Sequence, residues 1–82
     1  MITWADAEPS IKIGTLKGKV VVKVLNAADK AVAIFIGGKL ATSFVATSNY
    51  VVKQIKAAKG KRSVTVRIYS ANLLVKRIVT VK

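Results

Sequence analysis

Seven short segments of this chain share one pattern, an apolar residue at about every second position with many β-branched side chains among them. Successive side chains of a β-strand point to opposite faces, so this period of two indicates strands that bury one face. Glycine, asparagine, serine or lysine-glycine interrupts the pattern between segments, as expected of turns. The predicted strands are residues 10–16, 19–25, 31–36, 39–46, 50–56, 62–69 and 73–82. Short strands separated by turns at these intervals predict an all-β sandwich or small barrel.

The segment around residues 51–61 also fits a second interpretation, because its apolar side chains match the spacing of one helix face. We favour the strand. Strict alternation then places Lys53 on the same face as Ile55, and a bulge or twist near Gln54 would resolve that conflict.

Residues 1–9 differ from the rest of the chain, because they hold the only proline and two of the three acidic residues. We expect a lead-in or linker here and a domain spanning residues 10–82. No basic stretch followed by an apolar run is visible, so no secretory signal is predicted. The chain is either a complete product or a fragment of a longer secreted protein. For Trp4 the sequence leaves two expectations open: it staples the lead-in to the sandwich, or it rests on a neighbouring domain or subunit.

The chain contains neither histidine nor cysteine, which removes disulfides, zinc sites and the usual bases of nucleophilic catalysis. Its acids, Asp6, Glu8 and Asp29, are too scattered for a paired acid and base. We therefore predict no enzyme activity, no catalytic or metal-binding residue and no cofactor. The Gly37-Gly38-Lys39 sequence is interpreted as a hairpin turn, since a phosphate loop needs Ser or Thr next and a helix after it.

No membrane-spanning segment is predicted. The longest stretch without a charge is residues 40–52, which is shorter than the roughly 20 residues a spanning helix needs.

Charge is the strongest functional signal. The chain has 15 Lys and Arg but only three acids, which gives a formal net charge of +12. Three basic residues, Lys59, Lys61 and Arg62, cluster at one predicted corner and are the candidate anion-binding site. One interpretation is a patch for acidic polysaccharide, teichoic acid, nucleic acid or an acidic protein. The other is a solubilising coat that also protects strand edges. Nucleic acid is disfavoured, because Lys far exceeds Arg and no recognition helix or aromatic RNA-binding motif is present.

A second candidate surface follows from strand alternation. If the apolar residues at alternating positions of residues 62–69 face the core, Arg67 and Tyr69 face solvent. Phe35 would face outward from a neighbouring strand and share that surface, offering stacking and a cation to a sugar or a partner protein. In the alternative, the register is shifted by one and Phe35 belongs to the core.

The order GKVVVKVLNAADKAVAIFIGGKL, SNYVV and KAAKGKRSVTVRIYSANLLVKRIVTVK resembles bacterial immunoglobulin-like domains, with a Gly-Lys hairpin, a Gly-Lys corner and a closing V-T-V strand. The resemblance covers residues 10–82, and Ile or Phe replaces the family's third-strand Trp. It implies an all-β, immunoglobulin-like, seven-stranded antiparallel β-sandwich. Such domains are accessory modules of bacterial surface or secreted proteins, or parts of phage structural proteins.

The leading hypothesis is a non-catalytic structural or interaction module of a bacterial surface or secreted protein, at an extracellular or cell-surface location. Its partners would be other protein domains or subunits, or an anionic polysaccharide or envelope polymer. The alternative is a phage virion component, such as a capsid decoration or tail-associated protein. A nucleic-acid-binding domain is the third hypothesis.

Overall fold

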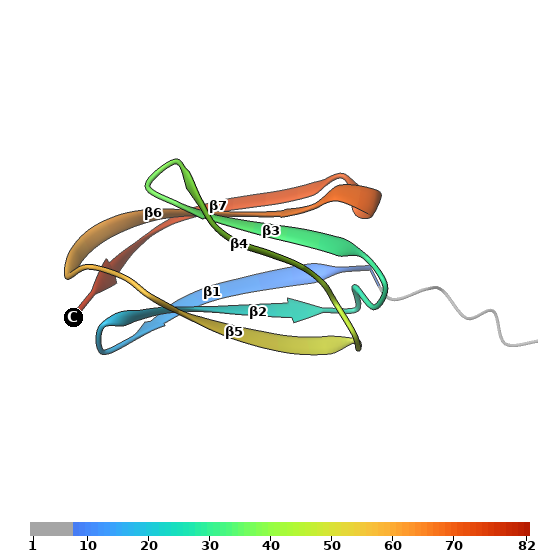
Figure 1. Cartoon of the computed structure of the whole chain (residues 1–82), viewed down its shortest axis with the longest axis horizontal. Helices are drawn as coiled ribbons and strands as arrows, with labels where there is room; N and C mark the ends of the chain where they lie inside the picture. The colour runs from blue at the N-terminus through green and yellow to red at the C-terminus, as the bar shows by residue number, and fades with distance from the viewer. Residues whose placement is uncertain (1–7) are drawn as a thin grey trace, which may run out of the picture.

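The computed structural model describes residues 8–82, which form seven β-strands in two antiparallel sheets (Figure 1). The strands are β1 (Ser10–Leu16), β2 (Lys19–Leu25), β3 (Ala31–Ile36), β4 (Lys39–Val45), β5 (Tyr50–Lys56), β6 (Gly60–Ile68) and β7 (Leu73–Val81), with a short 3₁₀ helix, η1 (Tyr69–Ala71), between β6 and β7. The all-β prediction is confirmed, and no predicted strand end is off by more than two residues. Within residues 8–82, no helix has the length and apolar character needed to cross a membrane.

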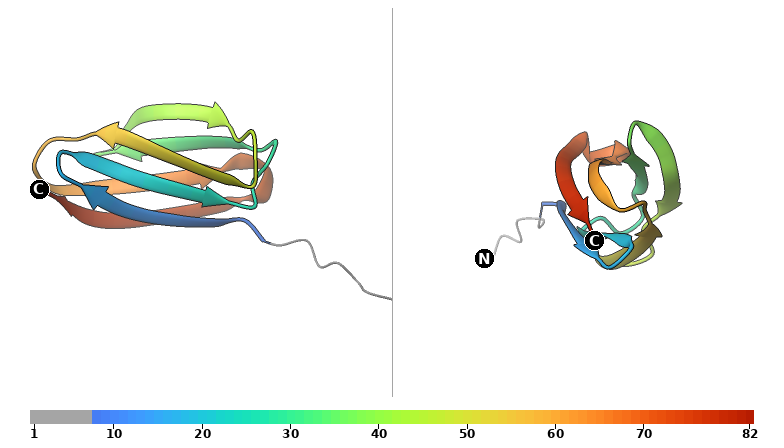
Figure 2. Two further views of the ribbon diagram at one scale, coloured as in Figure 1. Left: turned by 90° about the horizontal axis from the view of Figure 1, so that it is seen from below. Right: turned by 90° about the vertical axis from the view of Figure 1, so that its left-hand side faces the viewer.

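One sheet has three strands in the order β1-β2-β5, and the other has four in the order β4-β3-β6-β7 (Figures 1 and 2). Strands adjacent in sequence form the β1–β2, β3–β4 and β6–β7 hairpins. The β2–β5 and β3–β6 pairs join strands that are distant in the chain. These two long-range pairings decide which outward-facing side chains become neighbours.

The two sheets share one core of aliphatic side chains, in agreement with the alternating pattern of the sequence. The buried members are Ile13, Val20, Val22, Val24, Ala27, Val32, Ile34, Ala46, Val64, Val66, Ile68, Val79 and Val81. No polar or charged residue is buried in the described part of the chain. The apolar residues of β6 point inward as predicted, because Val64, Val66 and Ile68 are each 0% exposed. Burial of this apolar area is the main favourable contribution to folding.

The β3–β4 connection is a two-residue hairpin turn, as predicted. Gly37 and Gly38 have φ angles of 62° and 81°. Positive φ at both central residues is the geometry of a type I′ turn, which matches the twist of the flanking strands. The Gly37 N–H also donates a hydrogen bond of 2.8 Å to the Ser63 carbonyl, tying the turn to β6.

The alternative helix at residues 51–61 is wrong, because β5 pairs with β2 along its whole length. The predicted bulge near Gln54 is also wrong, since this pairing has no register shift; the irregularity lies instead between β3 and β4. Lys53 stays on the inner side of β5. Its Nζ lies 4.8 Å from the centroid of the Phe44 ring on β4.

The position of the two strands explains how a lysine is tolerated there. Both β4 and β5 are edge strands of their sheets. A long lysine stem can cover apolar surface while its ammonium leaves the core at such an edge, and the ring face adds a cation–π attraction.

Candidate binding surfaces

The outer face of the three-stranded sheet carries two pairs of lysines directly opposite each other, and we call it the lysine face. Lys12 on β1 is the partner of Lys23 on β2, and Lys19 on β2 is the partner of Lys56 on β5. Side chains in such positions have Cβ atoms roughly 4.5–5.5 Å apart, and like charges there destabilise a sheet. Neither Asp nor Glu occurs in β1, β2 or β5 to offset this repulsion.

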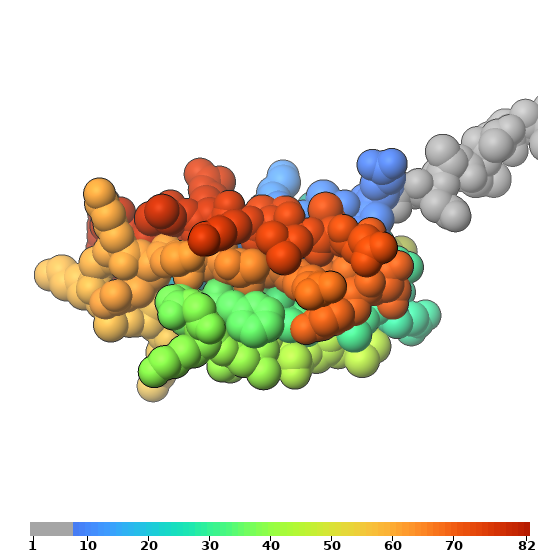
Figure 3. All heavy atoms as spheres, turned by 90° about the horizontal axis from the view of Figure 1, so that it is seen from above, coloured from blue at the N-terminus to red at the C-terminus, as the bar shows by residue number. Residues whose placement is uncertain are grey.

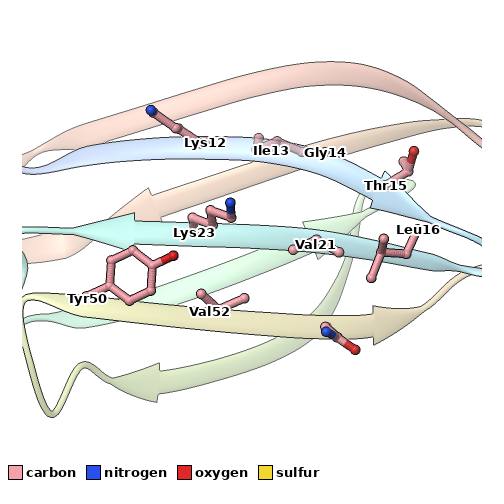
Figure 4. Close-up of a pocket in the computed structure, with 10 residues that line it drawn as sticks. Lys12, Ile13, Gly14, Thr15, Leu16, Val21, Lys23, Tyr50 and Val52 are labelled. Atoms are coloured by element: carbon pink, nitrogen blue, oxygen red, sulfur yellow. The ribbon is translucent and has the colours of Figure 1, made fainter.

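A hollow of about 520 Å³ lies on the lysine face, and Figure 4 shows its lining. The row formed by Gly14, Val21 and Gln54 runs across the sheet between the two lysine pairs. Gly14 contributes no side chain, and no atom lies within 4 Å of where a Cβ would stand. The Lys19 Nζ donates to the Gln54 Oε1 at 3.4 Å, which links one lysine pair to this row.

Apolar and aromatic carbon completes the hollow. Leu16, Val52 and Tyr50 line it together with the central row, and the Tyr50 side chain is 60% exposed. The hollow therefore combines ammonium groups, an amide and an accessible ring.

The predicted cluster of Lys59, Lys61 and Arg62 lies at the β5–β6 connection. Lys59 is in the connection itself, and the other two are among the first residues of β6. The Arg62 guanidinium is engaged by this loop, because its Nε–H donates to the Ala58 carbonyl and its Nη2–H to the Lys59 carbonyl, each at 2.9 Å. The structure therefore gives Arg62 a role in holding the loop, while Lys59 and Lys61 remain exposed.

Lys59 belongs to a larger group of lysines at this end of the sandwich. It surrounds a second hollow, of about 440 Å³, together with Lys17 and Lys82. Backbone hydrogen bonds join the elements involved: the Gly18 N–H donates to the Lys82 carbonyl at 2.7 Å, and the Ala57 N–H donates to the Gly18 carbonyl at 3.1 Å. We call Lys17, Lys59 and Lys82 the lysine pole.

Both acids within residues 8–82 lie at the opposite end of the sandwich. The Glu8 carbonyl accepts a hydrogen bond of 3.4 Å from the Asn26 Nδ2, and Asp29 lies in the β2–β3 loop that begins at Asn26. The two ends are well separated along the strands (Figure 2). The described acids thus lie at one end of the domain, and the lysine pole lies at the other.

The third predicted set, Phe35, Arg67 and Tyr69, is brought together on the outer face of the four-stranded sheet. Phe35 pairs with Thr65, and Arg67 pairs with Ala33, so all of these positions face outward. The Arg67 guanidinium carbon lies 4.8 Å from the centroid of the Tyr69 ring. The alternative register with Phe35 in the core is wrong, because Ile34 is fully buried and Phe35 is not.

Figure 3 views this outer surface, which we call the aromatic face, from outside. It has a shallow hollow of about 400 Å³, lined among others by Phe35, Tyr69, Leu40 and Val45. Ala33 lines it and is 1% exposed, although it is not part of the core between the sheets. Side chains of the aromatic face therefore cover Ala33 from outside.

The sequence interpretation missed the lysine face and its hollow. The pairing of Lys12 with Lys23 follows from a two-residue turn at Lys17-Gly18, because that turn places Leu16 opposite Lys19 and fixes the register behind it. The contribution of β5 has no such local signal, since its neighbour in the sheet is β2.

Across residues 8–82, no three His, Cys, Asp or Glu side chains gather closely enough to hold a metal ion. The surfaces described above offer ammonium groups, rings and small apolar hollows, which are means of binding. No protein-family model matches this chain, and comparisons with curated proteins and with solved structures give no match.

Proposed function

We propose that this domain is a non-catalytic interaction module that binds anionic polymers through a basic surface formed by the lysine face and the lysine pole. The observation that carries the proposal is the presence of seven lysines on two adjoining surfaces that share Leu16 and hold no acid. Four lysines stand on one sheet face and three at the adjoining end, whereas both described acids lie at the far end. Such a dense group of positive charges attracts anions and raises the rate at which they are captured.

The arrangement of the lysines supports binding over a simple solubilising coat. A coat needs only exposed charges of any placement, and it is best served by charges that do not repel one another. Here one lysine pair joins β1 to β2 and the other joins β2 to β5. The repulsion within each pair raises the free energy of the folded state. An anion placed between two ammonium groups removes that repulsion.

The strand order supports an immunoglobulin-like scaffold for this module. The orders β1-β2-β5 and β4-β3-β6-β7 differ from the constant-type immunoglobulin arrangement only in the fourth strand, which joins the third strand here and the fifth strand there. Membership of a bacterial surface or secreted protein, which the sequence resemblance implies, would place anionic envelope polymers within reach of the basic surface.

The proposal is tested by measuring the affinity of the protein for alginate and for duplex DNA as salt is varied. Each neutralised charge releases counterions, so the logarithm of the binding constant should fall linearly with the logarithm of salt concentration, with a slope near one per contact for a duplex. Absence of binding to both polymers at about 0.15 M salt, where the Debye length is about 8 Å, would overturn it.

A second candidate function is contact with a protein partner through the aromatic face. Its support is the set of Phe35, Arg67 and Tyr69 beside exposed apolar side chains, of which Ile78 is 67% exposed. Aromatic residues and Arg are enriched at protein interfaces, and the cation favours a partner with an acidic residue among apolar ones.

Peptide display provides the test of this second function. Peptides selected on the wild-type domain should combine an acidic residue with apolar ones and should lose binding to an Arg67→Glu, Tyr69→Ala variant. Selected peptides that bind the variant equally well would exclude this face.

A further inference from the structure

The hollow of the lysine face is lined by the Lys12 and Lys23 pair, and the Lys19 and Lys56 pair lies next to it along the strands. The Lys12 and Lys23 pair stands on one side of the Gly14, Val21 and Gln54 row, and the Lys19 and Lys56 pair stands on the other. Lys19 and Lys23 are four residues apart on the same strand, which corresponds to about 13 Å. A single small anion cannot contact both pairs. The spacing therefore fits a chain that carries repeated anionic groups.

The lining of the hollow has the chemistry of a sugar site. Val21 and Val52 present aliphatic carbon, and the accessible Tyr50 ring stands beside them. Such groups pack against the C–H faces of a pyranose ring, because a ring with an apolar body can bury carbon without losing its own hydrogen bonds. The Gln54 side-chain amide can accept and donate hydrogen bonds to hydroxyl groups.

Single-stranded nucleic acid fits this face less well. Proteins that bind it combine a basic groove with several aromatic side chains on which successive bases stack. The strands of the three-stranded sheet carry one aromatic residue, Tyr50, so a second base would find no ring. The four cations are lysines, which act as point charges and lack the flat, forked surface with which arginine stacks on bases.

We infer that the hollow lined by Lys12 and Lys23 is a binding subsite for an acidic polysaccharide whose sugars carry carboxylates. One uronic acid unit lies over Gly14 and Val21, and a unit further along the polymer lies beside Tyr50. Carboxylates of these units and their neighbours contact the lysine pairs. This assignment rests on the proposed function and specifies its ligand class and place.

Gly14 allows a test that leaves the charge of the protein unchanged. A Cβ at this position meets no atom within 4 Å, and the residue does not require a positive φ. Gly14→Ile therefore suits the strand, since β-branched residues are favoured there, and its side chain fills the hollow. The charge is tested separately by Lys12→Gln with Lys23→Gln. A double variant, Lys39→Gln with Lys76→Gln, is the matched control, because both lysines are exposed on the four-stranded sheet and the net charge changes by the same amount.

The experiment measures the affinity of each folded variant for a size-defined polymannuronate oligomer and for a single-stranded thymidine oligonucleotide, at about 0.15 M salt. Circular dichroism and thermal unfolding establish that each variant is folded. We expect Gly14→Ile and the Lys12, Lys23 variant each to lose about tenfold or more in polymannuronate affinity, with a change of about twofold or less in the control.

Equal losses in the two double variants, with no effect of Gly14→Ile, would overturn the subsite and leave the proposed function standing. Tighter binding of the oligonucleotide than of polymannuronate, with the same sensitivity to Gly14→Ile, would overturn the polysaccharide assignment in favour of nucleic acid. If the wild-type protein binds neither probe nor alginate nor duplex DNA, the proposed function fails and the subsite fails with it.

Discussion

The lysine face and the aromatic face are the two outer surfaces of the same sandwich, and the same strand alternation forms both. They differ in what their cationic side chains contact. On the lysine face, cations stand opposite cations, and the hollow between them is open above Gly14. On the aromatic face, the Arg67 guanidinium lies against the Tyr69 ring, and Ala33 is covered. The aromatic face thus gains stability from its own contacts. The strands of the lysine face offer its cations no acidic partner, as expected of a surface that meets an external anion.

The largest expected effect comes from comparing a core position of β6 with its neighbour on the aromatic face. Val66→Asp should unfold the domain, because a buried, unpaired carboxylate costs several kcal/mol or more and a small domain has about 5–15 kcal/mol of stability. The neighbouring Thr65→Asp, which points outward, should remain folded. Far-ultraviolet circular dichroism measures both. A folded Val66→Asp beside an unfolded Thr65→Asp would reverse the assignment of the two faces of β6.

The next effect compares one aromatic residue on each outer face. Phe35→Ala should lower the free energy of unfolding by about 1–2 kcal/mol, since a half-buried ring is lost over Ala33. Tyr50→Ala should change it by no more than about 0.5 kcal/mol, because the ring is largely exposed and free of the core. Urea unfolding measures both changes. Equal losses would mean that the two faces are equally packed.

A smaller effect is expected from the cation of the aromatic face. Arg67→Gln keeps a polar side chain but removes the cation above the Tyr69 ring, and it should destabilise the domain by about 0.5–1 kcal/mol. The same substitution in a Tyr69→Leu background should have no further effect. A loss that persists without the ring would assign the contribution of Arg67 to another contact.

The smallest effect has the opposite sign and tests the repulsion on the lysine face. Lys23→Glu converts the pair with Lys12 into one of opposite charge, and it should raise the free energy of unfolding by about 0.2–1 kcal/mol at low salt. The gain should shrink at high salt as the charges are screened. A stability loss would show that the lysine pairs do not repel, and the comparison between the two faces would lose its basis.

Sequence reasoning succeeded for the strands and for the direction of their side chains. It failed at the edge strand β5, where it predicted a bulge that the structure lacks. The alternation that buries Val64, Val66 and Ile68 is a local property, and the structure follows it. At Lys53 the same rule conflicted with charge, and a bulge was predicted. The structure keeps the alternation instead, because β5 is an edge strand from which the ammonium reaches the Phe44 ring.

The cluster of Lys59, Lys61 and Arg62 shows a second limit of sequence reasoning. Three basic residues near one glycine look equivalent in a sequence. In the fold, two N–H groups of Arg62 are used by the carbonyls of its own loop, and Lys59 is grouped with Lys17 and Lys82 from other parts of the chain. Which donors are free is decided by loop geometry, and composition carries no information about it.

The sequence by itself determined the seven strands and the register of the β1–β2 hairpin, which pairs Lys12 with Lys23. Short turns and side-chain alternation act over a few residues, so the strand register they impose can be read from the local sequence. Only the tertiary structure decided that β5 lies beside β2, which adds Lys56, Gln54 and Tyr50 to the lysine face. That pairing joins segments about thirty residues apart. It is chosen by which apolar faces can share one core, a property of the whole chain.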